Sequence, residues 1–176
     1  MTSVVFVAGP AGSGKSTLGD ALAASLDGVH LDFDVVSAGV VDAVRAAYPG
    51  SSEAELLLQV KDDRYAALHV ALADRLAGAP DAPVVVSAPF TRQIAGASTW
   101  QPWADLAPGA LVVWLRLDEG ERARRIASRG AVRDRGAATG PTTAPGVPHL
   151  ALEAADSTPA LVASVRRALD LAAEKG

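Results

Sequence analysis

Residues 4–17 read VVFVAGPAGSGKST, and they are the strongest indication of the fold. Its first five residues form an apolar run that predicts a buried central strand, and a helix is expected from Lys15 onward. Between them, residues 9–16 fit a phosphate-loop pattern, in which a glycine is followed by four residues and then Gly-Lys-Ser. The strand, loop and helix context makes a chance match improbable, so the stretch predicts a site for nucleotide phosphates.

Each part of this loop has a physical role in holding phosphate. Glycines let the backbone turn and bring N–H groups onto phosphate oxygens, and the helix start adds unpaired N–H groups. Lys15 is expected to reach the β- and γ-phosphates, and the Ser16 hydroxyl to ligate Mg²⁺. The alternative is a glycine-rich turn before an ordinary helix. The residues predicted to bind nucleotide are Gly9, Ala11, Gly12, Ser13, Gly14, Lys15, Ser16 and Thr17.

Apolar segments alternate with helical patterns along the rest of the chain. Further strands are predicted at 29–33, 83–88, 110–117 and around 150–152, and helices at 15–26, 35–48, about 51–77, 119–129 and from 158 onward. This alternation predicts an α/β fold with a parallel sheet and helices on both of its faces. A length of 176 residues suits one domain, so residues 1–176 are interpreted as a single unit.

Composition limits the classes of partner and site. The net charge of −4 argues against a nucleic-acid partner or an anionic membrane surface. The chain has no cysteine, which excludes disulfides, thiolate zinc sites and cysteine nucleophiles. No apolar run approaches the roughly 20 residues of a membrane span, and no signal-peptide pattern is seen. A cytoplasmic protein is therefore expected, while the oligomeric state cannot be predicted from the sequence.

Two carboxylates follow the second predicted strand, where residues 30–34 read HLDFD. The i, i+2 spacing of Asp32 and Asp34 places both on one face of a strand. They stand at its carboxyl end, the edge of an open α/β sheet where ligands bind. Such carboxylates can hold the water shell of a metal ion or orient a nucleophile. The alternative is that Asp34 only caps a helix that begins at Val35.

The third predicted strand ends at Ser87, where many P-loop proteins have an aspartate that orders Mg²⁺. This departure shifts the expected metal role to Asp32 and counts against a hydrolysing ATPase. Arg92, just beyond, could bind an anionic group of a substrate or simply be solvated. On the preceding helix, a solvated face is the favoured interpretation of Lys61 and Arg64. Trp100 and Trp103 are expected to cover the sheet.

Arginines gather on the helix predicted at 119–129. Arg122, Arg125 and Arg129 are spaced by three and four residues and share one face, and Arg133 follows. From the residues alone, these arginines can be interpreted as a solvated helix face that is balanced by the acidic residues just before it. The segment 130–148 is rich in Gly, Pro and Thr and lacks apolar anchors, so it is predicted to be a lid or a linker.

The phosphate loop, the Asp32–Asp34 pair and the arginine-rich helix before an irregular segment together resemble the small-molecule kinases of the P-loop superfamily. That group includes shikimate, gluconate and nucleoside monophosphate kinases and phosphotransferases of the chloramphenicol type, and it is related to AAA-type ATP-binding proteins. The resemblance implies a five-stranded parallel sheet of order 2-3-1-4-5 with a lid at 130–148. It implies ATP and Mg²⁺ as cofactors and a small-molecule acceptor that receives the γ-phosphoryl group on a hydroxyl or phosphate.

The same resemblance implies roles for individual residues. Ser16 and Asp32 would hold the metal, and Asp34 would contact the acceptor hydroxyl or act as base. Arg125 and Arg129 would contact nucleotide. The catalytic set would be Lys15, Asp34, Arg129 and Arg133. A nucleotide-binding regulatory ATPase without an acceptor is the alternative function, and the missing carboxylate at Ser87 is the feature that disfavours it.

Overall fold

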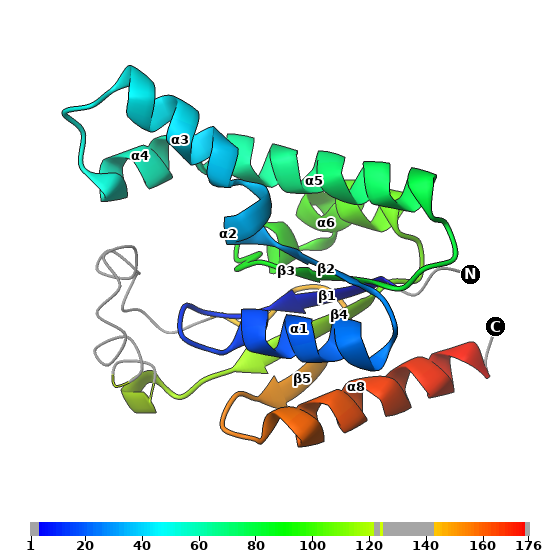
Figure 1. Cartoon of the computed structure of the whole chain (residues 1–176). Coiled ribbons are helices and arrows are strands. Elements are labelled where there is room, and N and C mark those ends of the chain that lie inside the picture. Colours follow the sequence, from blue (N-terminus) through cyan, green and yellow to red (C-terminus); the bar gives the residue numbers. More distant parts are fainter. Residues whose placement is uncertain (1–3, 122–123, 125–142, 175–176) are drawn as a thin grey trace.

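The computed structural model describes residues 4–121, 124 and 143–174 (Figure 1). Within this part of the chain, five strands form one parallel sheet of order β2-β3-β1-β4-β5. They are β1 (Val4–Ala8), β2 (Val29–Asp32), β3 (Val84–Ser87), β4 (Leu111–Arg116) and β5 (Leu150–Glu153). The α/β fold and the strand order predicted from the sequence are confirmed.

Two apolar layers hold the helices onto the sheet. Alternate residues of β1 point to opposite faces, so that Phe6 belongs to one cluster and Val5 and Val7 to the other. Helices α1 (Lys15–Ser25) and α8 (Thr158–Ala173) cover one face, and α5 (Lys61–Gly78) and α6 (Ala97–Leu106) cover the other (Figure 1). All five residues of β1 are buried, as expected for a central strand.

Two helices predicted as continuous are broken in the structure. The segment 35–48 forms α2 (Phe33–Val36) and α3 (Ala38–Ala47), and 51–77 forms α4 (Glu53–Gln59) and α5. The breaks fall at Ser37 and Val60, both of which are buried. The Ser52 side chain and Glu55 form a capping box that starts α4. Helices α3 and α4 extend beyond the carboxyl edge of the sheet (Figure 1).

Helix α6 follows a short 3-10 turn, η1 (Gln93–Ala95), and contains Pro102. It is not among the helices predicted from the sequence. Its tryptophans pack on the sheet as predicted: the ring centroids of Trp100 and Trp103 lie 4.9 and 5.8 Å from that of Phe6. The helix predicted at 119–129 and most of the segment 130–148 lie outside the described residues. None of the helices that are described has the length and apolarity needed to cross a membrane.

Candidate functional site

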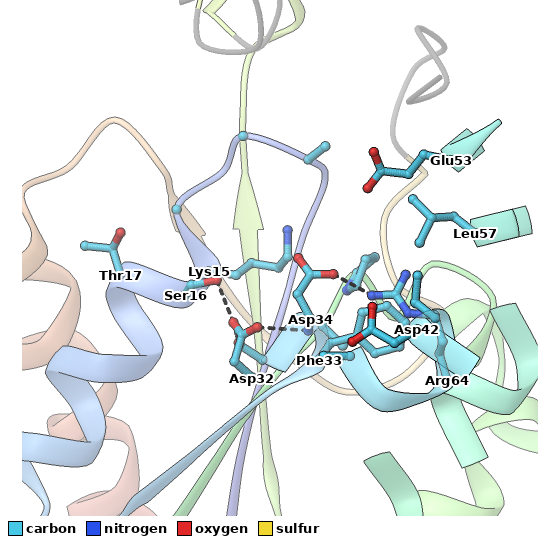
Figure 2. Close-up of a pocket in the computed structure, with 18 residues that line it drawn as sticks. Lys15, Ser16, Thr17, Asp32, Phe33, Asp34, Asp42, Glu53, Leu57 and Arg64 are labelled. Carbon is cyan, nitrogen blue, oxygen red and sulfur yellow. Dashed lines mark hydrogen bonds and ion pairs between the residues drawn. The ribbon is translucent and has the colours of Figure 1, made fainter. Parts of the chain in front are cut away.

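A cavity of about 420 Å³ opens at the carboxyl ends of β1, β2 and β3 (Figure 2). Its lining comes from the phosphate loop, the start of α1, the junction of β2 and α2, and helices α3, α4 and α5. Figure 2 shows the phosphate loop and Asp32 on one side, and Glu53 and Leu57 of α4 on the opposite side. The cavity therefore joins the predicted nucleotide site to a second region, which is lined in part by Glu53 and Leu57.

The phosphate loop leaves the first turn of α1 open to the cavity. Gly14 is the N-cap residue, with φ of 86°, and no described side chain caps the helix there. The first backbone N–H groups of such a helix attract an anion, and the helix dipole adds to the attraction. The Lys15 amine donates to the Pro10 carbonyl oxygen across the loop at 2.8 Å. The six predicted residues that line the cavity are Ala11, Gly12, Gly14, Lys15, Ser16 and Thr17.

Gly9 and Ser13, the other two predicted residues, shape the loop instead of lining the cavity. Gly9 has φ of 156°, and a Cβ atom there would lie 2.8 Å from Ser13 Oγ and 2.9 Å from the Leu115 carbonyl oxygen. Ser13 is 2% exposed, and its backbone N–H donates to Pro10 within the turn. Glycine is thus required at position 9 for packing, whereas positions 12 and 14 meet the cavity directly.

Asp32 closes β2 and is held on both carboxylate oxygens. Its Oδ1 accepts from the backbone N–H groups of Asp34 and Val35, at 2.9 and 3.3 Å. Its Oδ2 accepts from Ser16 Oγ at 2.6 Å and from Ser87 Oγ at 2.9 Å. Asp32 is therefore the N-cap residue of α2, and the interpretation of Asp34 as a helix cap is wrong, because α2 begins at Phe33.

Asp32 and Ser16 present oxygen donors of the kind that Mg²⁺ prefers. Burial alone would raise the pKa of Asp32, but the hydrogen bonds from Ser16, Ser87 and the α2 backbone outweigh it and hold the pKa below its usual range. No group of three or more acidic, histidine or cysteine side chains that could enclose a metal occurs among the described residues. The Asp32 carboxylate and the Ser16 hydroxyl are too few to enclose Mg²⁺ by themselves. They fit a cation whose remaining ligands include nucleotide phosphate oxygens.

Asp34 lies in the first turn of α2, beside Lys15 in Figure 2, and is paired with Arg64 of α5. The Arg64 Nη2 atom lies 2.6 Å from Asp34 Oδ1, and Nε donates to Ser37 Oγ at 2.8 Å. The guanidinium carbon also lies 4.1 Å from the centre of the Phe33 ring. Arg64 is only 8% exposed, so its interpretation as part of a solvated face is wrong. Packing of α2 and α3 on α5 covers it.

The remaining wall was not predicted from the sequence. Asp42 of α3 and Glu53 and Leu57 of α4 line the cavity. Arg45 lies beside both acids: its Nη1 is 2.8 Å from Asp42 Oδ1, and its Nη2 is 4.0 Å from Glu53 Oε1. No sequence pattern marks these residues, because helices α3 and α4 approach the loop only in the folded chain.

A family model of the AAA domain matches residues 4–142. The chain belongs to the AAA domain family. No curated protein matches it. The match agrees with the site geometry, because the matched residues include the phosphate loop and every described residue that lines the cavity.

Several solved structures share the fold of this AAA domain along nearly their whole length. A protein from Chloroflexus aurantiacus, provisionally assigned as a kinase, is 20% identical, with 97% of each chain covered and a TM-score of 0.73. The APS kinase of Mycobacterium tuberculosis is 19% identical over 96% of this chain and 98% of its own, with a TM-score of 0.64. A gluconokinase from Sinorhizobium meliloti is 23% identical over 99% and 98%, with a TM-score of 0.61. These neighbours confirm the P-loop kinase fold.

The described part of the chain leaves the predicted nucleotide-binding and catalytic arginines untested. Arg125, Arg129 and Arg133 lie outside the described residues. Arg92 pairs with Asp62 on the surface, where both side chains are exposed, and it does not line the cavity. Within the described lining, the cationic side chains are Lys15 and Arg64.

Proposed function

We propose that this AAA domain is an ATP-dependent phosphotransferase that moves the γ-phosphoryl group of Mg–ATP to a hydroxyl group of a small molecule. One observation carries the proposal: a single cavity holds the phosphate loop with the uncapped start of α1, the Asp32–Ser16 oxygen pair and, beside Lys15, the Asp34 carboxylate. The fold it shares with gluconokinase and APS kinase supports the same reaction class.

The nucleotide half of the cavity would be formed by the loop and the start of α1. Backbone N–H groups of residues 12–17 would donate to phosphate oxygens. Lys15 would exchange its hydrogen bond to Pro10 for one to the β- or γ-phosphate. Ser16 and Asp32 would hold Mg²⁺, which when bound neutralises charge on the phosphate oxygens.

In the proposed transfer step, Asp34 accepts the proton of the acceptor hydroxyl group. The acceptor oxygen forms a bond to the γ-phosphorus, and the bond from that phosphorus to the bridging oxygen breaks, so that ADP leaves. The acceptor proton passes to the Asp34 carboxylate, which Arg64 holds in place at 2.6 Å. Positioning and charge neutralisation supply most of the rate enhancement in such reactions.

The acceptor region is acidic, and this limits the class of acceptor. Asp34, Asp42 and Glu53 all line it. Arg64 is paired with Asp34 and Arg45 with Asp42, so the three carboxylates exceed these two guanidinium groups by one charge. An anionic acceptor would add like charge beside these carboxylates, while a neutral or cationic acceptor would not. We therefore propose a hydroxylated acceptor without net negative charge, such as a polyol, a nucleoside or an amino sugar.

The test is ADP release from Mg–ATP with three acceptor pools: neutral polyols and nucleosides, aminated sugars and aminocyclitols, and anionic sugar acids and nucleotides. We expect a neutral or cationic pool to raise turnover, and Lys15→Ala to lower that turnover by about 100-fold. Highest turnover with the anionic pool would contradict the acceptor class and leave the transferase intact. Turnover unchanged by every pool would favour a regulatory ATPase.

A further inference from the structure

A hydrogen-bonded series of side chains runs from the surface of α1 to the Asp32 carboxylate. Asp20 Oδ1 lies 2.7 Å from His30 Nδ1, and His30 Nε2 lies 2.8 Å from Ser87 Oγ. Ser87 Oγ in turn donates to Asp32 Oδ2 at 2.9 Å. The series joins α1, β2 and β3, and Asp32 and Ser87 are direct register partners of the two strands. Asp20 is exposed at 76% of its side chain, whereas the His30 side chain is only 9% exposed.

His30 determines which neighbour receives the Ser87 proton. A hydroxyl group carries one proton and can donate it to one partner only. When Ser87 donates to Asp32, its oxygen can accept from His30 Nε2–H, and the other ring nitrogen, Nδ1, lies 2.7 Å from Asp20 Oδ1. Without the ring, the Ser87 hydroxyl could rotate away, and Asp32 Oδ2 would lose one of its two side-chain donors.

Helix α1 leaves space for this ring by having a glycine at position 19. A Cβ atom at Gly19 would lie 2.3 Å from His30 Nε2 and 2.5 Å from Cε1. Glycine in the interior of a helix costs about 1 kcal/mol relative to alanine. The contact explains why an unfavourable residue occurs here: any larger side chain would displace the imidazole from Ser87.

The series also explains how the chain functions without a carboxylate at the end of β3. Ser87 occupies that position and has no charge to offer a cation, but its hydroxyl fixes a carboxylate on the neighbouring strand. We propose that His30 is a positioning residue of the metal–nucleotide site, which orients Ser87 so that Asp32 faces Ser16. This inference rests on the proposed binding of Mg–nucleotide. Removal of a partner that orients a metal ligand commonly lowers the affinity for the metal by about 10- to 100-fold.

The test measures the affinity of a fluorescent ADP analogue with Mg²⁺ and with EDTA, which separates the metal from the loop. In His30→Leu we expect the Mg²⁺-dependent gain in affinity to fall about tenfold, with the EDTA affinity within about twofold of wild type. His30→Gln should restore most of the gain, because its amide can donate to Ser87. Gly19→Ala should reproduce His30→Leu, whereas Gly78→Ala, a helix glycine with open space around it, should not.

Several outcomes would overturn the inference. An unchanged Mg²⁺-dependent gain in His30→Leu, or no difference between the Gln and Leu variants, would remove the positioning role. Equal losses with Mg²⁺ and with EDTA would show a structural role only. If His30→Leu fails to fold in a melting experiment, His30→Gln and Gly19→Ala decide the matter. Wild-type protein that binds ADP with no gain from Mg²⁺ would contradict this inference alone, and wild-type protein that binds no nucleotide would contradict the proposed function as well.

Discussion

Arg64 is a buried charged residue in the wall of the cavity. A desolvated guanidinium is costly, and here an ion pair, a hydrogen bond and a contact with an aromatic ring offset that cost. The partner, Asp34, is 48% exposed at its side chain and can therefore face an acceptor. The same contact that stabilises Arg64 thus orients the carboxylate proposed to act in transfer.

Replacement of Arg64 by methionine keeps an apolar side chain of similar length and removes the charge. We expect Arg64→Met to lower the free energy of unfolding by about 2 kcal/mol, because Asp34 and Ser37 lose a charged donor. The control is Arg92→Met, which breaks an exposed pair with Asp62 and should cost less than about 1 kcal/mol. Denaturation by urea measures both, and equal effects would contradict the role given to Arg64.

Single residues differ in how far the sequence reveals them. The phosphate loop and Asp32 could be predicted because their geometry is local: a glycine pattern before a helix, and a carboxylate at a strand end. Arg64 had a weaker signal, since it shares one helix stripe with the buried residues Leu68 and Leu72. Asp42 and Glu53 had none, because their place in the cavity depends on how α3 and α4 pack.

At the scale of elements, the turn after β3 depends on helix α5. Phe90 has φ of 51°, which is unusual for a bulky residue, and it is fully buried. Its N–H donates to the Tyr65 hydroxyl of α5 at 2.8 Å. Burial raises the pKa of Tyr65, so the oxygen that accepts from Phe90 belongs to a neutral hydroxyl group. Pro89, which lines the cavity, is thereby fixed by a contact from another element.

Removing that hydroxyl should weaken the turn. We expect Tyr65→Phe to lower the free energy of unfolding by about 1–3 kcal/mol, because the buried Phe90 N–H would lose its acceptor. Tyr48→Phe is the matched control, since Tyr48 is 53% exposed, and its effect should stay within about 0.5 kcal/mol. Thermal melting compares the two variants, and a silent Tyr65→Phe would contradict the account of this turn.

Element boundaries were less predictable than elements. The helical pattern continues through Ser37 and Val60, so neither break could be seen in the sequence. At Ser37 the break is explained by a tertiary contact: its hydroxyl donates to the Phe33 carbonyl oxygen and accepts from Arg64. Val60 is 2% exposed and donates to the carbonyl oxygens of α4 as α5 begins. Helices α3 and α4 lie between these two breaks, and both contribute residues to the lining of the cavity.

For the whole molecule, the order of the sheet brings the site together. The loop follows the central strand β1, and β3 lies between β1 and β2, so Ser87 and Asp32 end beside the start of α1. This arrangement was predictable because apolar strands alternate with helices and the motif marks the central strand. The acceptor wall was not, since it requires helices beyond the edge of the sheet (Figure 1).

Phosphate is proposed to leave ATP for an acceptor, and the fate of a label at the γ-phosphate distinguishes this transfer from hydrolysis. Wild-type protein, Mg²⁺, labelled ATP and the acceptor pools are incubated, and inorganic phosphate is separated from phosphorylated products. We predict label in an acceptor product, lowered about 100-fold in Asp34→Asn while ATP affinity stays within about twofold. Label found only as inorganic phosphate, at a rate that no pool changes, would contradict the claim.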